Sequence, residues 1–261
     1  MELNHTIKGF YQQLKIAITF IITFIAHSPT YAAAPFLTDD PVALDYHHYE
    51  IFLFANVDKN NLEILEPDLQ APAIEVNWGA ITNLQLHLVI PYAWSLPPAA
   101  PAANGIGDIE VGVTYRFIEE TANRPQVALV PVVELPTGNA NRELGNGKVW
   151  SKIPISAQKS WGPWTTYSEI GYAHNTAQDM LNYGYGGWVV QRDLNEKLTL
   201  GAELFFQGKQ TTENRSYTIL NAGGSYNFTQ NFSLVFSGGN SIWGENHLVG
   251  YLGLYWAGGG L

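Results

Sequence analysis

Residues 105–117 read GIGDIEVGVTYRF, and the alternation within this stretch decides the fold class. From residue 109 onward, apolar side chains fall on one side of an extended chain and mostly polar ones on the other: Ile109, Val111, Val113, Tyr115 and Phe117 against Glu110, Gly112, Thr114 and Arg116. Two glycines before an apolar run also suggest a dinucleotide-binding loop. That motif requires a third glycine where Glu110 stands, and then a helix. The stretch is therefore predicted to be a strand with one apolar and one polar face.

The rest of the chain repeats this pattern. Alternating segments of about ten residues or slightly more are expected at 44–56, 71–80, 83–94, 106–118, 125–135, 148–160, 163–174, 183–193, 198–207, 217–228, 231–240 and 247–257. The breaks between them alternate in length. Short breaks are predicted at 81–83, 119–124, 160–163, 194–197 and 229–231, and longer ones at 56–69, 95–105, 136–147, 175–182, 208–216 and 241–246. An even number of strands with short turns at one end and long loops at the other is typical of bacterial outer-membrane barrels.

Periodicity alone does not show whether the apolar face points inward, as in a soluble sandwich, or outward to lipid. Aromatic residues stand at or near the ends of the predicted strands, where membrane interfaces favour them: Trp78, Tyr92, Tyr115, Phe117, Trp164, Tyr172, Trp188, Phe206, Tyr226, Phe228 and Trp256. Strands of roughly 9 to 13 residues also suit a tilted membrane strand better than an average soluble one. We therefore predict an all-β, antiparallel, up-and-down transmembrane barrel of about twelve strands, with a soluble periplasmic barrel or sandwich as the alternative.

The N-terminus has the layout of a secretory signal. Lys8 and Lys15 precede an apolar stretch at 16–26, and small residues follow in SPTYAAA. We predict a signal peptide at 1–32, an N-terminal periplasmic segment at 33–43 and the transmembrane barrel at 44–257. A retained membrane anchor is the alternative for the first segment, although its apolar core is shorter than the roughly 20 residues that a spanning helix needs.

The composition limits the possible functions. The 261 residues include no cysteine, which excludes a disulfide framework and a thiolate metal site. The formal net charge is −10, so nucleic acid is not an expected partner. Only 14% of the residues are charged, against about a quarter in an average soluble domain.

Three stretches resemble one known family. They are GIGDIEVGVTYRF, ELPTGNANRELGNGK at 134–148, and PFLTDDP at 35–41 leading into HHYEIFLF. Together they resemble the meta-pathway phenol-degradation family of outer-membrane proteins, which are regarded as transporters. The resemblance extends over essentially the whole mature chain. It implies a location in the bacterial outer membrane and passage of small hydrophobic or aromatic compounds. One departure is the C-terminus, where Trp256 is followed by AGGGL rather than ending the chain on an aromatic residue.

No catalytic, cofactor or metal site is predicted. Gly147 and Lys148 look like the end of a phosphate-binding loop, but Arg142 and Val149 stand where that motif needs glycine and a hydroxyl residue. The adjacent pair at 47–48 places two histidines on opposite faces of a strand, where they cannot share one metal ion. Enzyme activity is therefore not expected.

If the apolar face meets lipid, the polar face lines the lumen. The candidate lumen-lining residues are Glu50, Glu75, His87, Glu110, Arg116, Glu134, Lys152, Glu169, Gln191, Glu203 and Asn221, with Phe52, Phe54 and Tyr167 beside them. Six carboxylates against two cations predict an acidic wall. Such a wall either forms hydrogen-bonded ladders that hold the strands or acts as an electrostatic filter for cations. Glu110 and Arg116 lie about 20 Å apart along one strand. We therefore expect Arg116 to meet another carboxylate and Glu110 to remain unpaired towards the long-loop end.

The predicted function is a channel or transporter that passes small solutes by passive diffusion, with hydrophobic or aromatic solutes implied by the family resemblance. Twelve strands leave a narrow lumen, which suits a selective path. The alternative is a closed structural or partner-binding barrel without transport activity. The expected partners are outer-membrane lipid, a small-molecule solute and the outer-membrane assembly machinery.

Overall fold

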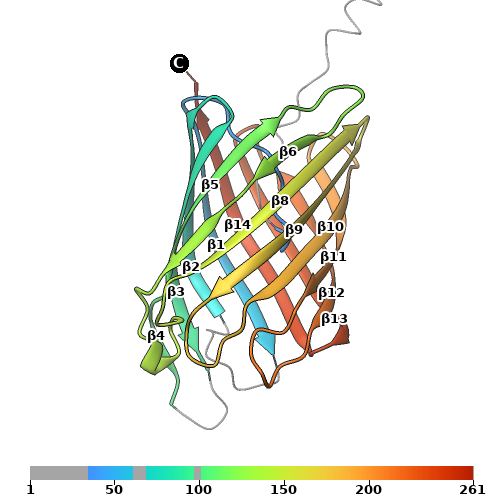
Figure 1. Cartoon of the computed structure of the whole chain (residues 1–261). Coiled ribbons are helices and arrows are strands. Elements are labelled where there is room, and N and C mark those ends of the chain that lie inside the picture. The colour runs from blue at the N-terminus through green and yellow to red at the C-terminus, as the bar shows by residue number, and fades with distance from the viewer. Residues whose placement is uncertain (1–34, 61–68, 97–100, 261) are drawn as a thin grey trace, which may run out of the picture. The chain divides into compact units, whose positions relative to one another are not determined.

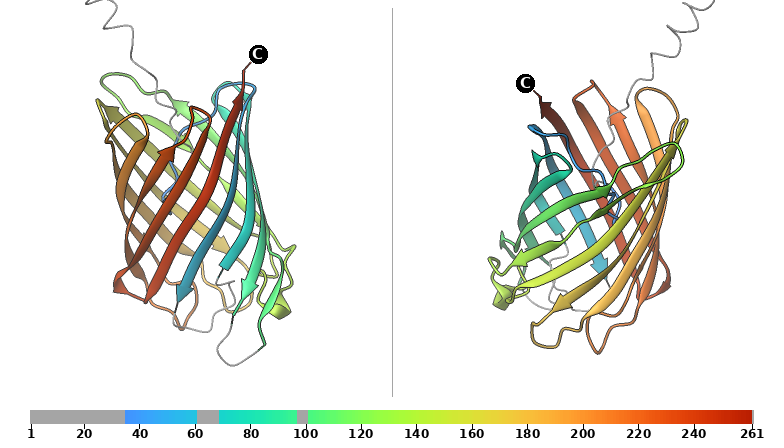
Figure 2. Two further views of the ribbon diagram at one scale, coloured as in Figure 1. Left: turned by 180° about the vertical axis from the view of Figure 1, so that it is seen from behind. Right: turned by 45° about the horizontal axis from the view of Figure 1, so that its top comes forward.

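The computed structural model describes residues 35–60, 69–96 and 101–260. The predicted signal peptide at 1–32 lies outside the described residues. Within them, β segments form one antiparallel sheet that closes into a barrel (Figures 1 and 2). The segments are β1 (His48–Asn60), β2 (Leu69–Ile81), β3 (Leu84–Ser95), β4 (Ala103–Ile106), β5 (Ile109–Ile118), β6 (Gln126–Leu129), β7 (Val132–Leu135), β8 (Trp150–Trp161), β9 (Trp164–Asn175), β10 (Tyr183–Asp193), β11 (Leu198–Gln207), β12 (Tyr217–Asn227), β13 (Phe232–Gly244) and β14 (His247–Gly259).

Two of the barrel strands are interrupted. β4 and β5 both pair with β3 and are separated by Gly107 and Asp108. β6 and β7 both pair with β5 and β8, and are separated by Val130 and Pro131. Proline has no N–H group to give to a neighbouring strand, which explains a break there. With each pair counted as one strand, the described residues form the predicted barrel of twelve antiparallel strands.

The barrel closes between its first and last strands. β1 and β14 pair without interruption from His48 opposite Gly259 to Asn60 opposite His247. Figure 1 shows these strands, blue and dark red, side by side. This long pairing satisfies the backbone groups of both strands, which a barrel in lipid requires because no water is there to replace them.

Apolar side chains point out of the barrel and polar ones point in. In β2, Ile74, Val76 and Trp78 are exposed, whereas Glu75 and Asn77 between them are buried. Ile170 on β9 is 73% exposed, while its neighbour Glu169 is 6% exposed. This arrangement is the reverse of a soluble sheet, and it gives the outer surface the apolar band of a transmembrane barrel.

Exposed aromatic residues gather at the short-turn end of the barrel: Tyr49, Trp78, Tyr115, Phe117, Trp161, Trp164, Tyr226, Phe228 and Trp256. Amphipathic rings prefer the boundary between hydrocarbon and headgroups, so they mark one membrane interface. In residues 35–60, 69–96 and 101–260, the structure contains no helix that is long and apolar enough to cross a membrane.

The ends of β1 and β13 differ from the predictions, and β1 runs to Asn60 rather than to residue 56. Residues 241–246 were expected to form a long loop, but β13 continues to Gly244, so only residues 245–246 join it to β14. The outward side chains Ile242 and Trp243 extend the apolar face there. β1 begins at His48 rather than at residue 44, because His47 has a positive φ of 65° and the preceding residues turn into the lumen.

Residues 35–46 are here called the lumen segment: residues 35–44 lie inside the barrel, and Asp45 and Tyr46 are exposed at its short-turn end. Glu203 on β11 accepts hydrogen bonds from Thr38 N at 2.7 Å and Thr38 Oγ1 at 2.6 Å. Ser237 Oγ on β13 donates to Pro35 O at 2.6 Å, and Leu44 N donates to Gln85 Oε1 on β3 at 3.1 Å. The sequence placed residues 33–43 in a periplasmic segment ahead of the barrel. Residues 35–43 instead lie within it, because its polar inner wall offers partners for their backbone groups.

The wall is shaped to receive the lumen segment. A Cβ atom at Gly187 on β10 would overlap Thr38 Oγ1, and one at Gly79 on β2 would overlap the carbonyl oxygen of Asp45. Glycine therefore provides the space for the segment at both positions. Phe36 packs beside Tyr167 and Val189 on the inner wall.

Candidate functional site in the barrel lumen

A cavity of about 400 Å³, here called the outer cavity, lies between the lumen segment and the long-loop end. Pro35, Phe36, Leu37 and Asp39 of the segment line its inner side. Residues near the ends of the strands, including Asp58 and Gln207, line it towards the long loops. The lumen segment thus separates the outer cavity from the short-turn end.

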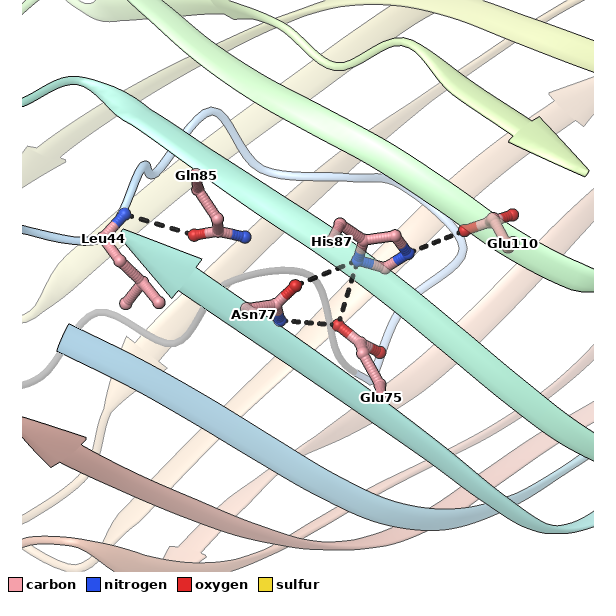
Figure 3. Close-up of polar contacts among 6 residues, drawn as sticks. All are labelled: Leu44, Glu75, Asn77, Gln85, His87 and Glu110. Atoms are coloured by element: carbon pink, nitrogen blue, oxygen red, sulfur yellow. Dashed lines mark hydrogen bonds and ion pairs between the residues drawn. The ribbon is translucent and has the colours of Figure 1, made fainter. Parts of the chain in front are cut away.

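One side of the outer cavity carries a hydrogen-bonded charge network on β2, β3 and β5 (Figure 3). His87 Nε2 lies 2.8 Å from Glu110 Oε1, and His87 Nδ1 lies 3.0 Å from Asn77 Oδ1 and 3.5 Å from Glu75 Oε1. Asn77 Nδ2 donates to Glu75 Oε1 at 2.7 Å, which leaves its oxygen as the acceptor for His87. Both ring nitrogens of His87 therefore face acceptors, the arrangement of a doubly protonated imidazolium.

The network continues onto β7 and β8. Glu134 lies opposite Glu110 in the pairing of β7 with β5, so two carboxylates are neighbours on the inner face. Trp150 Nε1 donates to Glu134 Oε2 at 2.8 Å. The Lys152 ammonium lies 5.1 Å from the centroid of the Trp150 ring, a cation–π contact, and its charge acts on both carboxylates. We call residues Glu75, His87, Glu110, Glu134 and Lys152 the charged wall.

Asp39 brings a further carboxylate from the lumen segment to the charged wall. Burial raises the pKa of the Asp39 carboxyl from its usual 3.8 to about 6, while the positive charge of Lys152 opposes the rise. Glu110 and Glu75 raise this pKa further, and His87 lowers it. Asp39 is therefore a group whose charge changes in the mildly acidic range.

Aromatic residues on β1, β14, β12, β11 and β10 line the remainder of the outer cavity, which we call the aromatic wall. Phe54 on β1 stacks on Tyr251 on β14, with ring centroids 5.0 Å apart and an interplanar angle of 20°. Tyr217 on β12, Phe205 on β11 and Tyr183 on β10 complete this wall, and Phe205 and Tyr183 pack with Trp150. The outer cavity therefore has a charged wall that adjoins an aromatic one.

The loop between β7 and β8 borders the mouth of the outer cavity. Asp108 accepts hydrogen bonds from Gly138 N at 2.8 Å and Asn146 N at 2.6 Å, and so ties the two ends of the loop to the break between β4 and β5. Leu144 is almost completely buried, packed with Ala93 and Ala103. The stretch 134–148, chosen from the sequence as a family signature, therefore folds as a fixed border of the mouth.

All the predicted lumen-lining residues lie on the inner face, but they have separate surroundings. Glu75, His87, Glu110, Glu134, Lys152 and Asn221 line the outer cavity. Glu203 binds the lumen segment and also accepts a hydrogen bond from Asn221 Nδ2 at 2.9 Å. Glu50 accepts a hydrogen bond from Tyr255 Oη at 2.8 Å. Glu169, 6% exposed, lies on the inner face of β9.

Two further predicted residues contact tyrosine side chains on the inner face. Gln191 Nε2 donates to Tyr167 Oη at 3.1 Å. Phe52 packs with Tyr255, their ring centroids 4.9 Å apart.

Two expected partnerships are wrong. Arg116 was expected to meet a carboxylate, but its Nε and Nη2 both donate to Asn83 Oδ1, at 2.9 and 2.7 Å. Glu110 was expected to be unpaired, but it bonds His87. The reason is the register of β3 against β5, which places His87 directly opposite Gly112 and within reach of Glu110. Sequence periodicity predicts the face of a strand but not this register.

Several residues that line the outer cavity were not predicted from the sequence, among them Asp39, Asp108 and Trp150. PFLTDDP and GIGDIEVGVTYRF were both noted as signatures, and Asp39 of the first and Asp108 of the second line the outer cavity. Within residues 35–60, 69–96 and 101–260, His, Asp and Glu side chains form no group of three placed to hold a metal ion.

A closed antiparallel barrel with an apolar outer band, an aromatic interface and a polar lumen defines the class of the protein, an outer-membrane β-barrel. The family model described as "Putative MetA-pathway of phenol degradation" matches residues 74–256. The chain belongs to this family, which confirms the resemblance seen in its sequence.

Solved structures share the fold at low sequence identity. An outer membrane channel from Pseudomonas putida F1 is 14% identical, with a TM-score of 0.66 over 89% of this chain and 98% of its own. The KdgM porin in complex with disordered oligogalacturonate is 10% identical, with a TM-score of 0.56 over 79% of this chain and 98% of its own. The translocator domain of the autotransporter NalP from Neisseria meningitidis is 9% identical, with a TM-score of 0.55 over 97% of both chains.

Proposed function

We propose that the protein is an outer-membrane channel through which small solutes diffuse passively, and that it has no enzymatic activity. The observation that carries this proposal is the outer cavity, a polar and aromatic space of about 400 Å³ inside the closed barrel that reaches the long-loop end. A volume of this size suits a small organic molecule. The similar folds titled outer membrane channel and porin support the proposal.

The solutes are small, and the aromatic wall makes those with an apolar or aromatic part the best candidates. Twelve strands enclose a narrow lumen, and the lumen segment narrows it further. A solute entering from the long-loop end reaches Phe36 and Asp39 before the short-turn end. Passage therefore requires a path beside the segment or its movement.

One observation favours a second candidate, a closed barrel that does not transport. The lumen segment is held on three sides, by Glu203, Ser237 and Gln85. If it never moves and leaves no path, the outer cavity is a blind pocket and the barrel serves a structural or partner-binding role. Permeability separates the two candidates.

Liposome swelling tests the proposal. The purified barrel is reconstituted into liposomes, and the swelling rate is compared among sugars, amino acids and small aromatic compounds of similar size, with empty liposomes as the control. We expect swelling above the control, fastest for compounds with an aromatic part. A correctly folded barrel that gives no swelling with any solute would support the closed alternative instead.

The proposal includes the route to the membrane. We infer that residues 1–32 are removed during export and that the assembly machinery inserts the barrel, with lipid around its apolar band. The intact mass of protein from the outer-membrane fraction should equal that of a chain starting at Ala33. A full-length mass in that fraction would show that the segment is retained.

A further inference from the structure

The outer cavity carries a surplus of negative charge. Among the described residues that line it, the acidic and basic ones are Asp39, Asp58, Glu75, His87, Asp108, Glu110, Glu134 and Lys152. Asp58 pairs with His247 at 2.8 Å, and Asp108 binds the loop backbone. Four carboxylates then face two cations, even with His87 charged. A positively charged guest is therefore favoured electrostatically over a negatively charged one.

Hydrogen-bonding groups of the cavity lining are also left for a guest. Asn221 is 2% exposed, and its Oδ1 has no hydrogen-bond partner in the described part of the chain, although its Nδ2 is bonded to Glu203. Tyr251 Oη, at the edge of the aromatic wall, is likewise without one there. Buried polar atoms normally have partners, and these atoms bond a ligand when their side chains turn towards the cavity. Gln207 Nε2 is a third such atom and offers a donor near the mouth.

The aromatic wall suits the apolar or aromatic part of a positively charged guest molecule. The stacked Phe54 and Tyr251 rings and Tyr217 line the same cavity as the charged wall, starting on β1 beside the Glu75 strand β2. Aromatic faces attract both apolar groups and cations. The cation–π contact between Lys152 and Trp150 is an example of an ammonium group against an aromatic ring in this cavity.

We propose that the outer cavity is a binding site for small organic cations, meaning primary amines with an aromatic or apolar body. The ammonium group binds among Asp39, Glu110 and Glu134, and the body of the molecule lies against the aromatic wall. This inference rests on the proposed function for its physiological role, as the place where a solute is selected before it passes the lumen segment. Binding itself is measured independently of transport.

The test is isothermal titration calorimetry of the folded, detergent-solubilised barrel with three probes of nearly equal size. Benzylamine, benzyl alcohol and benzoate carry positive, neutral and negative charge on the same ring. We expect benzylamine to bind about tenfold more tightly than benzyl alcohol, equivalent to about 1.4 kcal/mol, and benzoate to bind most weakly. Equal affinity for benzylamine and benzyl alcohol, tighter binding of benzoate, or no binding of any probe would overturn the inference.

Matched variants locate the site. Glu134→Gln keeps an acceptor for Trp150, and Asp39→Asn changes only the lumen segment, so both leave the barrel strands intact. Each should reduce the preference for benzylamine about threefold or more, whereas Glu196→Gln, in an exposed turn, should leave it unchanged. An unchanged preference in both cavity variants would contradict the assignment. If benzylamine binds as expected but liposomes containing the barrel do not swell, the proposed transport fails and the binding site stands.

Discussion

At the scale of single residues, the charge of the outer cavity depends on Glu110, which lies 2.8 Å from His87 and faces Glu134 across the pairing of β5 with β7. Replacing Glu110 with lysine would place three cations together and remove the local excess of negative charge. We predict that Glu110→Lys lowers the preference for cations over anions, most clearly at low salt, where screening is weakest. Reversal potentials in a salt gradient measure this.

The matched control for that variant is Glu196→Lys, which makes the same change in net charge in an exposed turn at the short-turn end. It should leave selectivity close to that of the wild type. Equal effects of the two variants, or none from Glu110→Lys, would mean that Glu110 only holds His87 in place and does not influence permeating ions.

Asp39 makes the charge of the outer cavity depend on pH. Its pKa of about 6 is raised above the usual 3.8, so the folded protein binds this proton more tightly than the unfolded chain. Binding of the lumen segment inside the barrel is therefore favoured when Asp39 is protonated. This contribution to the stability of the folded protein is lost as pH rises from about 4 through 6. The charged groups around it are Lys152 on β8, Glu110 on β5, His87 on β3, Glu75 on β2 and Glu169 on β9.

We predict that cation preference rises between pH 5 and pH 7 in the wild type, because Asp39 gains its negative charge there. Asp39→Asn should show a smaller rise. Asp45→Asn, in the exposed part of the same segment, should behave as the wild type does. Selectivity that changes equally with pH in all three proteins would assign the titration to another group.

At the scale of a strand, β5 shows what sequence periodicity predicts well. Val113 lies opposite Leu86, which is exposed, and Thr114 is buried on the inner face. An arginine facing lipid near the midplane costs about 2 to 4 kcal/mol, whereas one on the inner face does not enter the hydrocarbon. Val113→Arg should therefore destabilise the barrel by about this amount and Thr114→Arg by much less. Denaturant unfolding in lipid vesicles measures both, and equal destabilisation would contradict the orientation of the strand.

The position of the lumen segment inside the barrel depends on another strand, β10. A methyl group at position 187 would overlap Thr38 Oγ1 and crowd Phe205, whereas at position 184, on the outer face, its nearest neighbour is the carbonyl oxygen of Gly171 at 3.9 Å. We predict that Gly187→Ala displaces the segment and raises conductance, while Gly184→Ala does not. Unchanged conductance in Gly187→Ala would show that the segment does not control the path.

At the scale of the whole molecule, the fold was predictable because strand faces, strand count and turn lengths all follow from local patterns in the chain. The lumen segment was not, because its partners Glu203 and Ser237 lie more than 160 residues away in sequence and meet it only after the barrel closes. The same holds for the contact of His87 with Glu110, which depends on the register of two strands. The face on which a residue lies follows from the sequence of its own strand, whereas the site combines residues from several strands.

We propose that solutes and ions pass through this barrel. Single-channel recording of the folded wild-type protein in a planar bilayer tests it most directly. We predict reproducible current steps of small amplitude, as expected for a narrow lumen, with a reversal potential in a KCl gradient that shows a preference for cations. A barrel that is folded and inserted but gives no current steps, or one that prefers anions, would contradict this account.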